Sequence, residues 1–343
     1  MKPLRRAGVA LAGAAVVVAL WAIVRSIGPS QWAQVRCEHM ATTITVTAPA
    51  GRAEQAGSIV SDVFERIDLM MSEWKPGSPL TAINNAAGQR PVETPTELFN
   101  LITLGIQLGD ATAGAFDITW AALWGLWDFK AQPPVLPDPA EIEARLALVD
   151  YRRIQLDPEA RTVFLPDTGM LIGLGAIAKG YALDVAAGEL RAVGIDDFLI
   201  VAGGQVYAAG DRDGRPWRIG VRDPRAGPAD LIATIELRDG SASTSGDYEQ
   251  FFILDGQRHH HILDPRTGWP SSAARSATVI ASSAALADAL STALMVLGPD
   301  RGAAVVERYG VWAAVIDPEG ELSTLGPLRP PALSFQLDPA PAP

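Results

Sequence analysis

Three consecutive histidines, His259 to His261, stand in the stretch HHHILDPRTG, and the whole chain contains four histidines. Imidazole titrates near neutral pH, so such a residue can accept or donate a proton during a reaction. In an extended strand His259 and His261 would share one face and His260 would take the other. At most two of the three therefore point at one site. The DPRTG that follows predicts a turn, fixed by Pro265 and relieved by Gly268.

A second pair of residues with possible chemistry lies in the apolar stretch SSAALADALSTALMVLG. Asp288 and Thr292 are four residues apart, which places them on one face of a helix. A carboxylate and a hydroxyl one turn apart offer two hard oxygens, and these suit Mg²⁺. An aspartate favoured by the dipole near the start of a helix explains the same residue types. On this stretch alone, both interpretations stay open.

Glycines are closely spaced in IGLGAIAKGYALD, which contains Gly173, Gly175 and Gly180. Glycines allow the backbone to approach a ligand, and Lys179 supplies one cation where a helix begins. The stretch is not a nucleotide-binding Walker loop, because the spacing differs and Tyr181 stands where Ser or Thr would be required.

Tryptophans flank two further motifs. GAFDITWAALWGLW places aromatic bulk beside Asp117, and we interpret Trp124 and Trp127 as part of a core helix. MSEWKPGSPLTAIN, Met71–Asn84, predicts a loop with Trp74 near its head. An exposed tryptophan there would stack on a flat ligand, although a packed one is commoner.

Helical and strand-like patterns alternate irregularly along the chain. Helices are expected within 54–74, 95–114, 131–149, 178–194 and 282–298, the last with Ser282 or Ser283 as its N-cap and Gly298 as its stop. Strands are expected within 42–48, 161–166, 169–175, 197–210, 215–224, 231–244 and 249–265. Consecutive strands joined by Asp-Gly and Gly-Gly turns favour an α+β fold with an antiparallel sheet.

Composition narrows the class of protein. With 48% hydrophobic and 20% charged residues, the chain should be globular. Its net charge is −11, and removing the four basic residues of the first thirty leaves −15. A body this acidic should not bind nucleic acid nonspecifically. The single cysteine, Cys37, excludes an intrachain disulfide.

The ends of the chain differ from its body. Residues 7–24 carry no charge and follow the basic MKPLRR, so they predict a membrane anchor with an exported body, in preference to a cleaved signal peptide. We assign 1–30 to this segment and its linker, which extends towards residue 36. Residues 327–343 predict a Pro-rich, frayed tail.

In their order along the chain these pieces resemble the ApbE family of FAD:protein FMN transferases. The resemblance covers about residues 37–326, the predicted catalytic domain. It rests on MATTITV, MSEWKPGSPLTAIN, GAFDIT, GLGAIAKGYALD, AGG, STSGDY, HHILDPRTGWP and DALSTAL.

The resemblance implies the family's α+β fold, with a flavin cleft between the sheet and its helices. A Thr or Ser hydroxyl of a client protein would attack the FMN phosphorus of FAD with Mg²⁺ present, and AMP would leave. His261 would be the base or proton shuttle. The implied Mg²⁺ ligands are Asp288, Thr292 and the backbone carbonyl of Ala176. The implied FAD contacts are Met40, Trp74, Ala115, Phe116, Asp117, Gly173, Lys179, Ile262 and Ser291.

Two positions depart from the family's pattern. Gly173 stands where an Asp is usual, which removes a carboxylate from the flavin and metal neighbourhood, and MAT at Met40–Thr42 replaces Met-Gly-Thr. A Mg²⁺-dependent FAD pyrophosphatase and a non-catalytic flavin-binding assembly protein remain alternatives on sequence. The expected client is an exported flavoprotein, such as a periplasmic electron-transfer subunit. The expected location is the inner membrane with the catalytic domain in the periplasm, or a cleaved periplasmic form.

Overall fold

The computed structural model describes residues 31–227 and 229–337. The predicted anchor and linker of residues 1–30 lie outside the described residues. Within the described ranges, none of the helices combines the length and apolar character that a bilayer crossing requires.

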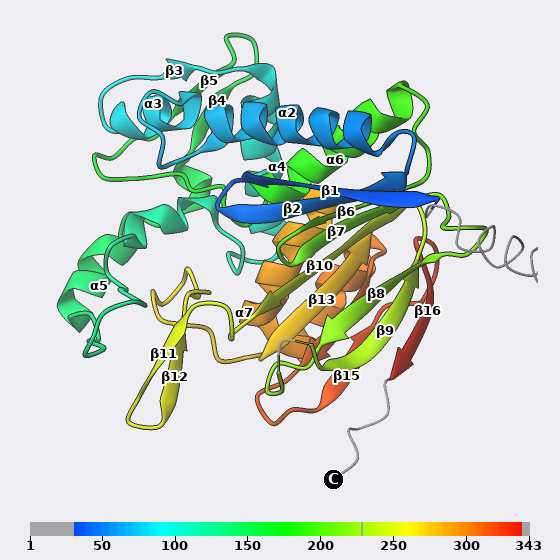
Figure 1. Cartoon of the computed structure of the whole chain (residues 1–343). Coiled ribbons are helices and arrows are strands. Elements are labelled where there is room, and N and C mark those ends of the chain that lie inside the picture. Colours follow the sequence, from blue (N-terminus) through cyan, green and yellow to red (C-terminus); the bar gives the residue numbers. More distant parts are fainter. Residues whose placement is uncertain (1–30, 228, 338–343) are drawn as a thin grey trace, which may run out of the picture.

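In the described part of the chain, eight strands form one fully antiparallel sheet (Figure 1). Their order across the sheet is β1 (Trp32–His39), β2 (Thr42–Pro49), β6 (Phe198–Ala202), β7 (Gln205–Ala209), β10 (Gly240–Gly246), β13 (Ser276–Ala281), β14 (Trp312–Ile316) and β15 (Leu322–Leu325). The predicted α+β class with antiparallel sheet is confirmed.

The two faces of this sheet are covered differently. One face packs against the helices α2 (Ala53–Met71), α6 (Ala178–Ala192) and α7 (Ala284–Tyr309). The other face packs against a small sheet of β8 (Trp217–Arg222), β9 (Leu231–Leu237) and β16 (Ala332–Leu337). Neighbouring residues of β13 accordingly enter different cores, Val279 on the helix side and Ile280 on the other. Burial on both faces explains why the central strands are apolar throughout.

The remaining elements surround one end of these layers. They are α3 (Pro79–Asn85), β3 (Val92–Glu93), α4 (Thr96–Ala111), η1 (Ile118–Leu123), α5 (Pro139–Leu146), η2 (Tyr151–Arg153), β4 (Gln155–Asp157), β5 (Thr162–Phe164), β11 (Phe251–Leu254) and β12 (Gln257–His260). The hairpin of β11 and β12 packs through Phe252 on Trp127, in a third apolar cluster.

Helix α7 confirms both of its expected boundaries. The hydroxyl of Ser283 accepts the Leu286 N–H, so Ser283 is the N-cap. The helix breaks at Gly298, whose φ of 69° is left-handed, and a second helical segment starts at Pro299.

Four expectations about secondary structure were wrong. Residues 169–175 form no strand, because Asn84 and Ile118 bond the backbone groups of Ile172 and Gly173 in place of a neighbouring strand. The supposed linker contains most of β1, and the supposed loop Met71–Asn84 contains most of α3. The tail is not frayed through residues 332–337, because β16 pairs with β9 and Phe335 packs on Trp312.

Candidate functional site

Close contact between α6 and α7 builds the centre of the candidate site. A Cβ at Gly180 would lie 2.2 Å from the Ala284 carbonyl oxygen, so only glycine allows this approach. One turn further along α6, Asp184 accepts the N–H groups of Ala284 at 2.6 Å and Ala285 at 3.0 Å. Asp184 therefore satisfies free N–H groups at the start of α7 and fixes the helix that carries Asp288.

Asp288 is a buried carboxylate held from two other elements. It is 2% exposed. Its Oδ2 accepts the Gly180 N–H at 3.0 Å, and its Oδ1 accepts from Gln205 Nε2 at 2.9 Å. Burial raises the pKa of this carboxyl, and nearby Lys179 lowers it. An ionised carboxylate has about four acceptor positions, so two remain for a ligand.

Hydroxyl groups of the next helical turn lie close to the Asp288 backbone, because Ser291 Oγ and Thr292 Oγ1 donate to the Asp288 carbonyl at 2.9 Å and 3.4 Å. Thr292 Oγ1 is 3.3 Å from Ser245 Oγ, and Ser245 Oγ is 2.9 Å from Ser291 Oγ. Ser291 is fully buried and also lies 3.2 Å from Ser243 Oγ. The structure thus brings together the three predicted residues of α7 and adds two serines of β10.

This oxygen-rich donor set fits Mg²⁺. Gln205 Oε1 is buried and has no hydrogen-bond partner in the described part of the chain, so it is a further unsatisfied oxygen near Asp288. No group of three or more His, Cys, Asp or Glu side chains that could hold a metal occurs among the described residues. One carboxylate with neutral oxygens still suits Mg²⁺, which keeps several waters and often binds substrate phosphates. Ala176, the third predicted ligand, lies in the turn that leads into α6.

Lys179 adds positive charge to this site from the first turn of α6. Its Nζ donates to the Gly175 carbonyl at 2.9 Å. Burial raises the pKa values of Asp288 and Glu73 and lowers that of His261, and the charge of Lys179 opposes the first two shifts and adds to the third. These three residues come from three separate segments, so Lys179 contributes positive charge to each of them.

Gly173 is enclosed by the segment that follows GAFD. Its N–H donates to the Ile118 carbonyl at 2.8 Å, and its carbonyl accepts from Trp120 Nε1 at 3.2 Å. A Cβ at Gly173 would lie 2.9 Å from Ala121 Cβ and 3.2 Å from Trp120 Nε1. The space that a side chain would need at this position is therefore already filled.

Trp74 is not packed in the core. It is 71% exposed and stacks on Trp124 with ring centroids 3.8 Å apart. Trp120 meets Trp124 edge to face at 5.7 Å. Trp127 is buried as expected and Trp124 is half-buried, but the expected core helix is wrong for both, because η1 ends at Leu123. The result is an exposed aromatic surface connected through Trp120 to Gly173.

Asp117 has a structural task that the sequence did not reveal. Its Oδ1 accepts from Thr119 N at 2.7 Å and Thr119 Oγ1 at 2.6 Å, and its Oδ2 accepts the Tyr151 N–H at 3.1 Å. It caps η1 and ties that segment to η2. Ala115 and Phe116 are buried in the main core, so their side chains are not free to contact a ligand.

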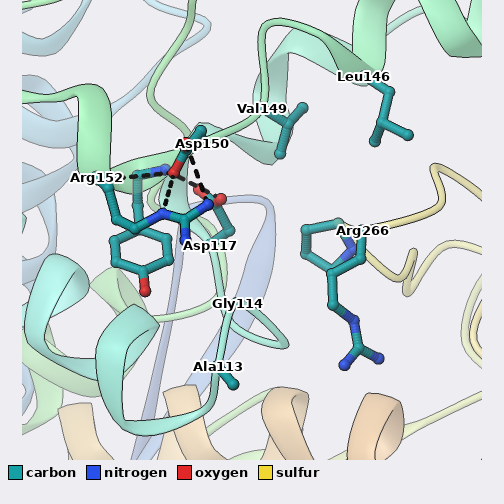
Figure 2. Close-up of a pocket in the computed structure, with 10 residues that line it drawn as sticks. Ala113, Gly114, Asp117, Leu146, Val149, Asp150, Arg152 and Arg266 are labelled. Carbon is teal, nitrogen blue, oxygen red and sulfur yellow. Dashed lines mark hydrogen bonds and ion pairs between the residues drawn. The ribbon is translucent and has the colours of Figure 1, made fainter.

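A cavity of about 430 Å³ lies beside Asp117 (Figure 2). Figure 2 shows Arg266 of the DPRTG turn across this cavity from Arg152. Each arginine is already paired with an aspartate two residues away, Asp264 or Asp150. The cavity wall contains neither Asp288 nor His261.

The three histidines have three different environments. His259 stacks among Trp127 and Phe252, and His260 donates from Nε2 to the Ser271 carbonyl at 2.8 Å. Both are strand residues, as expected. β12 ends at His260, so strand alternation does not extend to His261. The predicted DPRTG turn is confirmed, with φ of 73° at Gly268.

His261 has a buried ring nitrogen that is free to accept a proton. Its Nδ1 is buried without a hydrogen-bond partner within residues 31–227 and 229–337. Burial, together with His260 and Lys179, lowers its pKa to about 4. The imidazole is therefore neutral near pH 7 and able to accept a proton. Ile262, the next residue, is buried, and its carbonyl accepts the Ser271 N–H.

Met40 reaches the site region from the first hairpin. Met40 and Ala41 have φ values of 49° and 58°, which form a tight turn between β1 and β2. The next residue, Thr42, closely faces Gly203, where a Cβ would lie 3.1 Å from Thr42 Oγ1. Gly203 directly precedes β7, so this turn lies near the start of that strand, where Gln205 stands.

Sequence reasoning missed Gln205, Ser245 and Glu73. Ser243 and Ser245 alternate within STSGDY, a signal that would have placed both on one face of a strand. No local pattern indicates Gln205, because its partner Asp288 is 83 residues away.

Comparison with known proteins adds independent evidence. Residues 40–316 match the ApbE family. A Vibrio cholerae protein named FAD:protein FMN transferase is 34% identical over 252 residues, covering 72% of this chain and 75% of its own length. A Klebsiella pneumoniae protein of the same name is 34% identical over 278 residues, covering 79% of each chain.

Solved structures agree with these sequence matches. The crystal structure of the ApbE protein from Thermotoga maritima is 33% identical, with a TM-score of 0.79, and covers 86% of this chain and 97% of that one. The flavin transferase ApbE from Vibrio cholerae is 30% identical, with a TM-score of 0.77 and the same coverage.

Proposed function

The chain belongs to the ApbE family, and from this premise we propose that it is an FAD:protein FMN transferase. It would move FMN from FAD to a Thr or Ser hydroxyl of another protein and release AMP. The observation that carries the proposal is the buried Asp288 carboxylate, which Gly180 and Gln205 orient, with the Thr292 hydroxyl donating to the Asp288 backbone carbonyl and lying 3.3 Å from Ser245 Oγ.

We infer that Asp288, Thr292 and the carbonyl of Ala176 would hold Mg²⁺. When bound, this ion would neutralise negative charge on the diphosphate, which an acidic protein of net charge −11 cannot do with its overall field. Lys179 would add one positive charge at the same place. The surroundings of Asp288 support this assignment, since Gly180 and Gln205 hold the carboxylate in position while leaving acceptor capacity free.

His261 would act as the base. The client hydroxyl oxygen would form a bond to the FMN phosphorus, its proton would pass to the neutral imidazole, and the bond from phosphorus to the AMP oxygen would break. A pKa of about 4 keeps this imidazole unprotonated at working pH. It also makes the acquired proton easy to lose, so the base is regenerated for the next turnover.

We also propose a location and a client class. The uncharged segment 7–24 and its basic flank would anchor the chain in the inner membrane with the catalytic domain in the periplasm. The client would then be an exported flavoprotein, such as an electron-transfer subunit. Carbonate washing of membranes tests the anchor, and recovery of the full-length chain in the wash would overturn it.

The proposed reaction is tested by measuring AMP and protein-bound flavin together. The full-length chain in mild detergent is given FAD and Mg²⁺, with and without a client domain that carries an acceptor threonine. AMP that requires the client and matches a fluorescent client band supports the transferase. AMP without a client identifies an FAD pyrophosphatase instead, and bound FAD without AMP identifies a binding protein.

A further inference from the structure

The glycine-rich loop has no room for a side chain at Gly173, but a carboxylate reaches this loop from another segment. Glu73, in the motif MSEWKPG, places Oε1 3.6 Å from where a Cβ would lie on Gly175. Burial raises the pKa of the Glu73 carboxyl, and backbone hydrogen bonds from its own N–H and from Leu174 oppose that rise. Glu73 therefore contacts the loop two residues beyond Gly173.

The position of Glu73 is unusual for a carboxylate with no task. It is half-buried, and it makes no ion pair within 4 Å in the described part of the chain, although the charge of Lys179 opposes the rise in pKa that burial causes. The neighbouring Asp68 is, in contrast, paired with Lys75 at 2.6 Å. Two backbone donors leave about two acceptor positions of Glu73 unused.

Two neighbours of Glu73, Trp74 and Lys179, are residues that the resemblance implies as FAD contacts. The exposed Trp74 follows Glu73 directly and offers an aromatic face, Gly175 is an exposed loop residue, and Lys179 donates from the first turn of α6 to the Gly175 carbonyl. A ligand that stacks on Trp74 and reaches Lys179 with its phosphates would have to pass the carboxylate. The part of FAD between a ring and a phosphate is a sugar or sugar alcohol, which carries hydroxyl donors.

We propose that Glu73 is an FAD-binding residue whose carboxylate accepts a hydrogen bond from a ribityl or ribose hydroxyl of FAD. It supplies from the MSEWKPG segment the carboxylate that Gly173 cannot carry. This inference rests on the proposed function, because it assumes that FAD is the substrate. It adds a residue that discriminates FAD by its hydroxyl groups.

Calorimetric titration of the full-length protein tests this role. FAD, FMN and ADP are titrated separately, with Mg²⁺ present, into wild type, Glu73→Gln and Glu65→Gln. Glu65 is the matched control because it is an exposed glutamate on nearby α2. Loss of one hydrogen bond to a charged acceptor should weaken FAD binding of Glu73→Gln about tenfold or more, with the control unchanged.

The two fragments separate the two hydroxyl sources. Weakened FMN binding with unchanged ADP binding identifies a ribityl hydroxyl, and the reverse identifies a ribose hydroxyl. Equal affinity of Glu73→Gln and Glu65→Gln for FAD overturns the inference while leaving the transferase intact. Equal loss for both fragments with a lower thermal midpoint also overturns it, since Glu73 would then only hold the loop.

Two further results keep the test decisive. If Glu73→Gln does not fold, Glu73→Asp replaces it, because the shorter side chain keeps the charge but withdraws the carboxylate. Its affinity for FAD should then fall below that of wild type, and an unchanged affinity overturns the inference. Wild-type protein that binds no FAD overturns the proposed function and this inference together.

Discussion

Asp117 and Asp288 are both buried carboxylates, and burial raises the pKa of each, but their surroundings differ. Asp117 accepts three hydrogen bonds from Thr119 and Tyr151 and has Asp150 nearby. Asp288 accepts two, from Gly180 and Gln205, and has the cation of Lys179 nearby. The Asp117 carboxylate joins η1 to η2, whereas the Asp288 carboxylate is held in place with hydrogen-bond acceptor positions still free.

The difference shows that burial and a raised pKa do not by themselves identify a functional carboxylate. The number of acceptor positions still free, and the charge beside them, separate the two residues. The free capacity of Asp288 depends on donors from α6 and β7, which keep its orientation fixed without using all its lone pairs. Asp117 uses most of its capacity inside its own region.

The largest expected effect comes from Asp288→Asn. This substitution keeps the shape but replaces one metal-binding oxygen by an N–H donor, so Mg²⁺-dependent AMP release should fall at least about a hundredfold. Steady-state AMP formation at saturating FAD measures it, with circular dichroism to check folding. Asp117→Asn provides the contrast, and should cost about 1–3 kcal/mol of stability with little change in Mg²⁺ affinity of the folded protein. Interchanged phenotypes would invalidate the distinction.

Gly180→Ala should separate α6 from α7. The new methyl group would meet the Ala284 carbonyl at 2.2 Å, so we expect about 1–3 kcal/mol of destabilisation by urea unfolding, and weaker Mg²⁺ binding because Asp288 loses its donor geometry. Gly188→Ala on the same helix is the control. Among the described residues no atom lies within 4 Å of its new methyl group, so it should stabilise the helix by up to about 1 kcal/mol. The two alanine variants behaving alike would refute the close-contact argument.

Gln205→Ala tests the other donor to Asp288. Removing the amide leaves Asp288 Oδ1 without its partner, and supporting residues of this kind are worth about tenfold or more in metal affinity. Mg²⁺ titration of AMP release should therefore show about a tenfold higher requirement. Gln205→Glu replaces the amide donor by a second carboxylate beside Asp288, so its Mg²⁺ requirement is expected to differ from that of Gln205→Ala. A Mg²⁺ requirement unchanged in Gln205→Ala would show that Asp288 needs no such support.

The smallest expected effect is a shift of the acid limb of kcat/KM to lower pH. The folded pKa of His261 is about 4, below its ordinary value of 6.5, so the base stays neutral as the pH falls through 6.5. The acid limb of kcat/KM should accordingly lie near pH 4 and not near 6.5. Unfolded chains take up a proton on His261 between these values while folded ones do not, so stability should fall as pH is lowered through that window. An acid limb at 6.5 that disappears in His261→Gln would contradict this environment.

Local patterns predicted much of the fold. The apolar period of α2, the Ser283 cap and the Gly298 break are written in neighbouring residues. The resemblance named Lys179, Ser291 and Thr292, which lie near Asp288, but not Gln205 or Ser245. Contacts between distant segments were not predictable in the same way. The Asp117 carboxylate accepts the Tyr151 N–H, the Gln205 amide donates to Asp288, and the tail segment that contains Phe335 pairs as β16 with β9. In each case the partners lie far apart in the sequence.

The measurement that most directly tests the central claim follows flavin transfer in three proteins side by side. Wild type, Asp288→Asn and Asp117→Asn are given FAD and a client domain, with and without Mg²⁺, and AMP and client fluorescence are recorded together. We predict matched AMP and fluorescence for wild type and for folded Asp117→Asn, both Mg²⁺-dependent, and neither product for Asp288→Asn. Full transfer by Asp288→Asn, or transfer by wild type without Mg²⁺, would contradict the assignment of Asp288 as the centre of the site.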